Sequence, residues 1–70
     1  MINQIIKFHA DLEKGECVKI IEAFGGRTYV NRTDLIKKAN DNVLLILRAN
    51  GSKVAVNVNY IVVCCVIRRL

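Results

Sequence analysis

The sequence predicts a small, mainly β protein of the α+β class. We expect an antiparallel curved sheet or barrel of about five strands behind an N-terminal helix. An amphipathic stripe occupies the first residues, β-prone segments follow from residue 17 onward, and turn signals separate these segments. The chain has 70 residues, 53% of them hydrophobic. Such a chain makes one domain (1-70), and its composition excludes intrinsic disorder.

An N-terminal helix is predicted over residues 1–14. The side chains at the i, i+3, i+4, i+7 spacing of one helix face are Ile2, Ile5, Ile6, His9 and Leu12. Gly15 follows directly, and glycine is a typical residue at the end of a helix. The residues around Ile5 and Phe8 are also compatible with a strand, so both alternatives stay open at this point.

A β meander is predicted from residue 17 to residue 67, with one short helical turn inside it. The first strand, residues 17–24, ends at the turn pair Gly25-Gly26, and residues 27–31 form the returning strand. Thr33-Asp34 resembles a helix cap, so we expect the helical turn at residues 34–39.

The clearest local signal is a β hairpin around Asn50-Gly51. This dipeptide separates the β-prone runs 43–47 and 53–56, and it favours a two-residue type I′ turn with positive φ at both central positions. Such a turn pairs Arg48 with Lys53. It also creates one wholly apolar face, expected to be the core, made of Val43, Leu45, Leu47, Val54, Val56 and Val58. Leu44 and Ile46 would then lie under the helix or in a subunit interface.

The last predicted strand covers residues 61–67 and is apolar on both faces. Such strands are typical of the middle of a structure. A chain this short buries only about 60% of its unfolded surface. Its apolar excess therefore indicates a homo-oligomer, in which a second copy covers part of the surface.

No membrane segment is expected. The longest apolar run, residues 60–67, is much shorter than the roughly 20 residues of a transmembrane helix. The N-terminus lacks the pattern of a signal peptide. We therefore expect a cytoplasmic protein without membrane contact.

The order of elements, a helix followed by short antiparallel strands, resembles the plan of Sm-like small β-barrel proteins. Members of that family form rings by pairing the edge strands of neighbours, and they bind RNA. The resemblance therefore implies a ring-forming, RNA-binding protein. The Gly and Asp-Asn placements of the Sm signature do not stand in this sequence, and no RNA-binding residue is transferred.

The middle of the chain is also similar to a family of small flagellar-operon proteins. The matching positions are Gly26, Val30, Asp34-Leu35-Ile36, the strand 43–47 and Asn50-Gly51-Ser52-Lys53. The similarity ends after Val56, where that family has a charged helix. Short, basic chains without proline also resemble many phage-encoded proteins.

Residues that could support catalysis are few. His9 is the single histidine and lies on the apolar stripe of the predicted helix, which favours a packing role over a catalytic one. The three cysteines, Cys17, Cys64 and Cys65, have neither the number for a disulfide framework nor the spacing of a metal site. Nucleotide-binding loops and paired carboxylates are missing. The sequence therefore predicts a protein that is not an enzyme and holds no metal or cofactor.

The charge distribution indicates an anionic partner. The formal net charge is +5, divided into −1 for residues 1–26 and +6 for residues 27–70. The expected phosphate-binding or nucleic-acid-binding residues are Arg27, Tyr29, Arg32, Arg48 and Lys53, with Tyr29 as the stacking ring. Lys37-Lys38 and Arg68-Arg69 are compatible with either phosphate contacts or plain solvation.

The best functional prediction is a non-catalytic, oligomeric binding protein for phosphate-bearing ligands, with nucleic acid as the first choice. One alternative is a phage-type sponge that sequesters a small nucleotide at a subunit interface. A second alternative is an inhibitor that binds a host protein.

Overall fold

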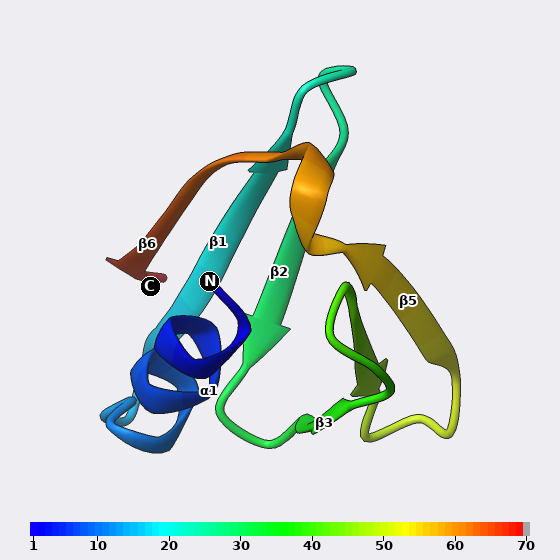
Figure 1. Cartoon of the computed structure of the whole chain (residues 1–70). Helices are drawn as coiled ribbons and strands as arrows, with labels where there is room; N and C mark the ends of the chain where they lie inside the picture. Colours follow the sequence, from blue (N-terminus) through cyan, green and yellow to red (C-terminus); the bar gives the residue numbers. More distant parts are fainter. Residues whose placement is uncertain (70) are drawn as a thin grey trace.

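A computed structural model describes residues 1–69 of the chain. Helix α1 (Ile2–Ala10) precedes the strands β1 (Glu16–Glu22), β2 (Arg27–Asn31), β3 (Leu35–Lys38), β4 (Val43–Leu47), β5 (Lys53–Asn57) and β6 (Ile61–Arg68), and the 3₁₀ turn η1 (Val58–Tyr60) connects β5 to β6. The strands form two antiparallel three-stranded sheets, in the orders β2-β1-β6 and β3-β4-β5. This confirms the mainly β, α+β fold class. The described sheets are curved toward each other but do not close into a barrel (Figure 1).

The N-terminal segment is a helix, and it is shorter than residues 1–14. It begins after Met1, whose carbonyl accepts the N–H of Ile5 at 3.1 Å, and ends at Ala10. The prediction that Gly15 ends the helix is therefore wrong. The φ of +88° at Gly15 instead serves the turn before β1, in which the N–H of Glu16 donates to the carbonyl of Glu13. Among the described residues, no helix is long and apolar enough to span a membrane.

The β4–β5 hairpin has a different turn from the predicted one. Gly51 donates its N–H to the carbonyl of Arg48 at 3.0 Å, and Arg48 donates to the carbonyl of Ser52 at 2.8 Å. Gly51 has a φ of +91°, whereas no non-glycine residue in the described chain has a positive φ. The loop is therefore a three-residue turn with a glycine bulge, and the two-residue type I′ turn is wrong.

The extra loop residue shifts the register by one, so that Leu44 and Ile46 of β4 join the predicted Val54 and Val56 of β5 on the core face. Leu44 pairs with Val56 and Leu47 with Lys53. Leu44 and Ile46 are fully buried, whereas Val43, Leu45 and Leu47 of the predicted core face are only partly buried. The core cluster contains Ile2, Ile5, Leu12, Val18, Ile20, Val30, Leu44, Ile46 and Val56.

Residues 35–38 form strand β3 and not the predicted helical turn. They pair antiparallel with β4, from Leu35 opposite Leu47 to Lys38 opposite Leu44. Thr33-Asp34 looked like a helix cap because a carboxylate there does accept a backbone N–H. The donor, however, is Asn31, three residues before Asp34, at 2.8 Å. The carboxylate thus closes a turn between β2 and β3.

Strand β6 lies at the edge of its sheet, although its sequence predicted a central position. Its hydrogen-bonded neighbour is β1, and no described strand pairs with its other side. Val62 is 63% exposed and Val63 is 43% exposed. An apolar strand therefore faces solvent here, close to the viewer in Figure 1.

Candidate anion-binding pocket

The predicted pairing of Arg48 with Lys53 is wrong, because the register places Leu47 opposite Lys53. Arg48 instead turns inward to Asp34, which is only 3% exposed. Its Nη1 donates to Asp34 Oδ2 at 2.8 Å and also to the carbonyl oxygen of Tyr29. The Asp34 carboxylate further accepts the N–H of Asn31 and, at 3.3 Å, that of Ala49. Arg48 therefore holds the β4–β5 hairpin to the β2–β3 turn.

Neighbouring hydrogen-bond donors stabilise the negative charge of Asp34. Burial alone raises the pKa of this carboxyl group, but three donors oppose that effect: the N–H of Asn31, the Arg48 guanidinium and the N–H of Ala49. Together they hold the pKa of Asp34 below its usual value. The pair is ionised at neutral pH, and the charge of Arg48 is largely neutralised by it.

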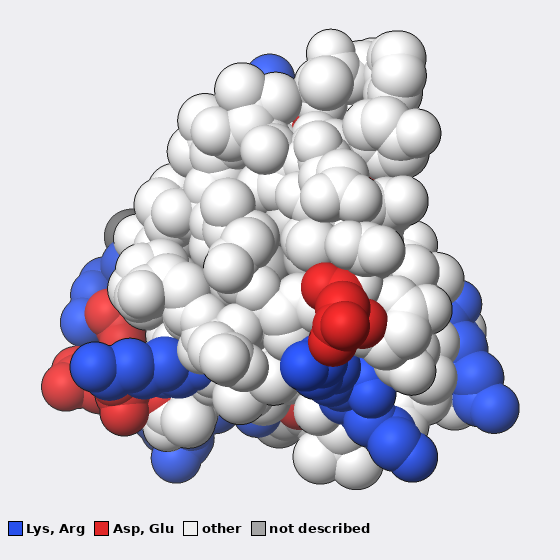
Figure 2. Space-filling view, in the orientation of Figure 1, with Lys and Arg blue, Asp and Glu red and all other residues white. Residues whose placement is uncertain are grey.

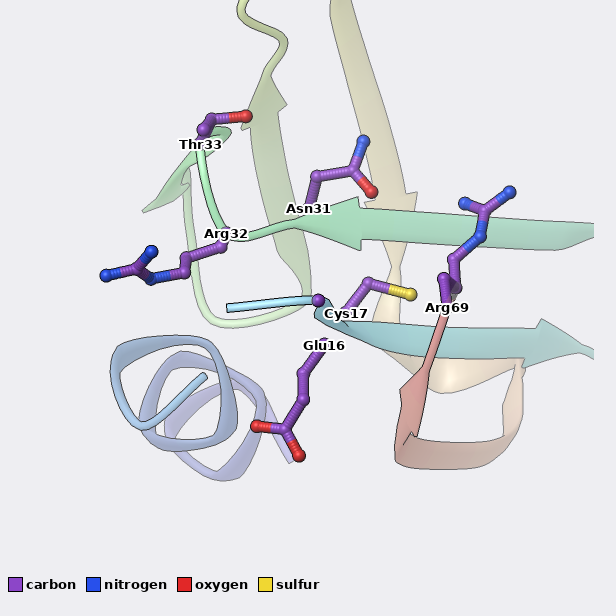
Figure 3. A pocket seen from close by; sticks show the side chains of 7 residues that line it. Glu16, Cys17, Asn31, Arg32, Thr33 and Arg69 are labelled. Carbon is purple, nitrogen blue, oxygen red and sulfur yellow. The ribbon is translucent and has the colours of Figure 1, made fainter. Parts of the chain in front are cut away.

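A separate pocket of about 280 Å³ lies where the start of β1, the end of β2 and the end of the described chain meet (Figure 3). Its lining residues are Gly15, Glu16, Cys17, Asn31, Arg32, Thr33 and Arg69. In Figure 3, Arg32 and Arg69 stand on opposite sides of it, with Asn31 and Cys17 between them. The fold thus brings together two arginines that are far apart in the sequence.

Arg69 is held in place by its backbone and by an aromatic ring. Its N–H donates to the carbonyl of Gly15 at 2.7 Å, which continues the β1–β6 ladder. Its guanidinium carbon lies 4.7 Å from the centre of the Tyr29 ring. A guanidinium stacked on a ring still offers the N–H groups along its edge to a ligand. Tyr29 consequently positions Arg69 and has one ring face already covered.

The acidic residue of the pocket is engaged elsewhere. Glu16 accepts the N–H of Glu13 at 2.8 Å and lies 3.7 Å from the Arg68 guanidinium. Figure 3 shows its carboxylate directed away from Arg69. Within residues 1–69, neither Arg32 nor Arg69 forms an ion pair. The pocket therefore presents two positive charges that the described chain does not neutralise.

The other predicted site residues are dispersed. Arg27 begins β2 and Arg32 follows its end, so the strand separates them. Lys53 begins β5, and its side chain is exposed. Of the predicted set, only Arg32 lines this pocket, and Tyr29 contacts it indirectly by stacking on Arg69, while Arg27, Arg48 and Lys53 do not line it. The sequence did not predict Thr33 and Arg69 as partners of Arg32. Arg69 comes close only because β1 pairs with both β2 and β6.

A second pocket of about 220 Å³ adjoins the first and shares Asn31 and Thr33 with it. Its charged groups are Asp34 and Arg48, which neutralise each other. Because an incoming anion would have to compete with the Asp34 carboxylate, this pocket is the weaker anion site.

The remaining reactive side chains do not form a site. His9 is half-buried, and its Nε2 donates to the carbonyl of Asn31 at 3.1 Å. Burial raises the pKa of the Cys64 thiol, and the electrostatic effect of the adjacent Cys65 raises it further. Among residues 1–69, no three His, Cys, Asp or Glu side chains gather in a way that could hold a metal ion.

No protein family, no curated protein and no solved structure matches this chain. The resemblances to Sm-like and flagellar-operon proteins therefore stay predictions.

Proposed function

We propose that the chain is a non-catalytic binding protein for phosphate-bearing ligands, with single-stranded nucleic acid as the first choice. The observation that carries this proposal is the pair Arg32 and Arg69 in one pocket. Guanidinium groups form bidentate hydrogen bonds with phosphate oxygens. The hydroxyl of Thr33, which lines the same pocket, adds a further donor.

Nucleic acid is favoured over a single phosphate ion because the positive charge extends beyond the pocket. Residues 27–70 carry the net charge of +6. Figure 2 shows most of the visible Lys and Arg side chains toward the lower end of the molecule, with Asp and Glu side chains among them, and a mostly uncharged surface above. A phosphate backbone could contact several of these cations in succession, whereas a lone phosphate would use one pocket.

Binding of labelled single-stranded RNA across a salt series tests the proposal. We expect the parent to bind with a clear salt dependence. Arg32→Ala and Arg69→Ala should each weaken binding and lower the salt slope by about one unit. Arg27→Ala is the matched control, because it removes the same charge at the far end of β2 and should have the smaller effect.

Four outcomes would contradict this proposal in different ways. A parent that does not bind RNA at low salt ends the nucleic-acid reading. Equal losses for Arg27→Ala and Arg32→Ala would mean diffuse attraction and no defined pocket. Competition by a mononucleotide as effective as that by RNA would favour the small-nucleotide alternative, and binding to neither would favour a protein partner.

We further infer that the protein acts as a homo-oligomer. The support is the exposed apolar surface, which includes Phe24 at 83% and Val62 at 63% exposure. The ring of Phe24 lies 5.5 Å from that of the exposed Tyr60, and neighbouring apolar groups on a surface typically mark interaction sites. Sedimentation at micromolar concentration should give a mass above that of one chain, and a stable monomer would overturn the inference.

A further inference from the structure

We propose that two copies of this chain pair edge to edge through β6, antiparallel and around a two-fold axis. The two sheets of order β2-β1-β6 would then join into one continuous sheet. This interface rests on the proposed homo-oligomer and specifies which surface forms it. The occupant of the β6 edge is thus a second β6.

The outer edge of β6 lacks the features that usually prevent an edge strand from pairing with another chain. A register shift between Ile21 and Glu22 of β1 disturbs the pairing at the start of β6, and from Val63 to Arg68 the pairing is regular. Natural edge strands are usually protected by lysine, proline, a bulge or a covering segment. Residues 63–67 contain neither a charge nor a proline, and no described strand covers them.

The apolar core is incompletely covered beside β6. In the register, Val66 lies opposite Val18, and Cys64 opposite Ile20. Val18 and Ile20 are fully buried, whereas Val66, which is paired opposite Val18, is 38% exposed. A strand added outside β6 would cover Val66 and complete the burial that β1 already has.

The charges at one end of β6 favour an antiparallel arrangement of the two copies. Between Lys53 and Arg68 the chain has no charged residue, and Arg68-Arg69 follow at one end of β6. A parallel pair would place the arginines of both copies side by side, which is destabilising. An antiparallel pair places them at opposite ends of the interface.

The backbone also defines the register of the pair. Because the N–H of Arg69 bonds to Gly15, alternation directs the backbone groups of Arg69, Ile67 and Cys65 toward β1. Those of Cys64 and Val66 are directed outward and would bond to the second copy. Pairing Cys64 with the second copy's Val66 centres the interface and places the two Cys65 residues opposite each other.

The apolar surface continues beyond the strand. The rings of Phe24 and Tyr60 lie 5.5 Å apart, and the N–H of Ala23 binds the carbonyl of Tyr60 at 2.7 Å. Figure 2 shows uncharged surface over the front of the molecule, where Figure 1 places β6. This surface can widen the contact around the paired edges.

Sedimentation under reducing conditions tests the interface. We expect the parent to be a dimer and Val63→Lys to be a monomer, because a lysine on the edge opposes strand pairing. Leu35→Lys is the matched control, since Leu35 is 65% exposed on β3 of the other sheet. It should remain a dimer, and circular dichroism should show that both variants are folded.

Disulfide trapping tests the register independently. Cα atoms of directly opposed residues lie within the range that a disulfide bridges. Mild oxidation should cross-link the Cys64→Ser variant through Cys65 and leave Cys65→Ser uncross-linked. Cys17 is buried and should not contribute.

The results separate the two proposals. A monomeric parent would overturn both the homo-oligomer and the interface. A Val63→Lys variant that stays dimeric, or a Leu35→Lys variant that becomes monomeric, would leave an oligomer but overturn the β6 interface. A closed ring in place of a dimer, or cross-linking through Cys64 alone, would overturn the two-fold arrangement.

Discussion

Strands β4 and β6 are both unbroken apolar runs, but they occupy opposite environments. In β4, Leu44 and Ile46 have no exposed surface, and β3 and β5 pair with its two edges. In β6, Val62, Val63 and Val66 are all exposed, and β1 is the one neighbour among the described strands.

This difference shows that an apolar run gives a strand a tendency to be buried. The run does not determine which strands pair with it. The two neighbours of β4 are adjacent in sequence and joined to it by short loops. After β5, the turn η1, capped by Asn57 Oδ1 on the N–H of Asn59, separates β6 from the second sheet. Strand β6 then pairs with β1 in the first sheet, and its outer side remains open.

Shortening one side chain in each strand should give the largest contrast. Ile46→Ala is expected to cost about 2–5 kcal/mol of unfolding free energy, because it leaves a cavity in a fully buried site. Val66→Ala should cost less than about 1 kcal/mol in the monomer. Urea denaturation at low protein concentration measures both. Equal losses would contradict the distinction between the two strands.

Removing the charge that holds β4 in place should have the next largest effect. Asp34→Asn leaves the Arg48 guanidinium without its anion and places an amide among N–H donors. Because Arg48 retains some solvent exposure, we expect a loss of about 2–4 kcal/mol in urea denaturation. The control is Asp41→Asn, whose carboxylate pairs with Lys38 on the surface. It should change stability by less than about 0.5 kcal/mol.

The turn that sets the β4 register gives a third comparison. Gly51→Val introduces a β-branched residue at a φ of +91° and should cost about 1–3 kcal/mol. Gly26→Ala is the control, because Gly26 does not have a positive φ and a Cβ there would make ordinary contacts near 3.8 Å. Thermal unfolding should show a clear loss for the first variant only. A fully stable Gly51→Val protein would refute the observed turn.

Lowering the pH should weaken the Asp34–Arg48 ion pair that holds β4, and this effect on stability should be the smallest of the four. The pKa of Asp34 is lower in the folded state than in the unfolded state, so its contribution is complete above the unfolded value of about 3.9. That contribution is lost as the pH falls from there through the folded pKa. Urea midpoints of the parent should decline over this interval, and the part due to this group should vanish in Asp34→Asn. An identical decline in both proteins would mean that Asp34 is not responsible.

Much of the local structure follows from the sequence alone. The spacing of Ile2 and Ile5 produces a helix with one buried face, and alternating β-prone runs produce strands near their predicted positions. Gly25 and Gly51 mark the β1–β2 and β4–β5 hairpin loops, because each turn needs a positive φ that glycine adopts without strain. These features depend on residues close together in the chain.

The register of β4 and β5 cannot be predicted from the residues of the turn alone. Asn50-Gly51 fits both a two-residue and a three-residue loop, and these differ by one position in the pairing. The observed loop allows Asp34 to accept the N–H of Ala49 and to pair with Arg48. Leu44 and Ile46 then face the core. A contact between residues distant in sequence therefore favours one of two locally similar turns.

The sequence by itself determined the fold class, the position of most elements and the excess of positive charge after residue 26. Only the tertiary structure decided which charges are neutralised and which strand lies at the edge. Arg48 is paired with Asp34, while Arg32 and Arg69 share a pocket, because the pairing of β1 with both β2 and β6 brings distant residues together. Such pairings depend on the long-range burial of apolar surface, which has no signature in the spacing of neighbouring residues.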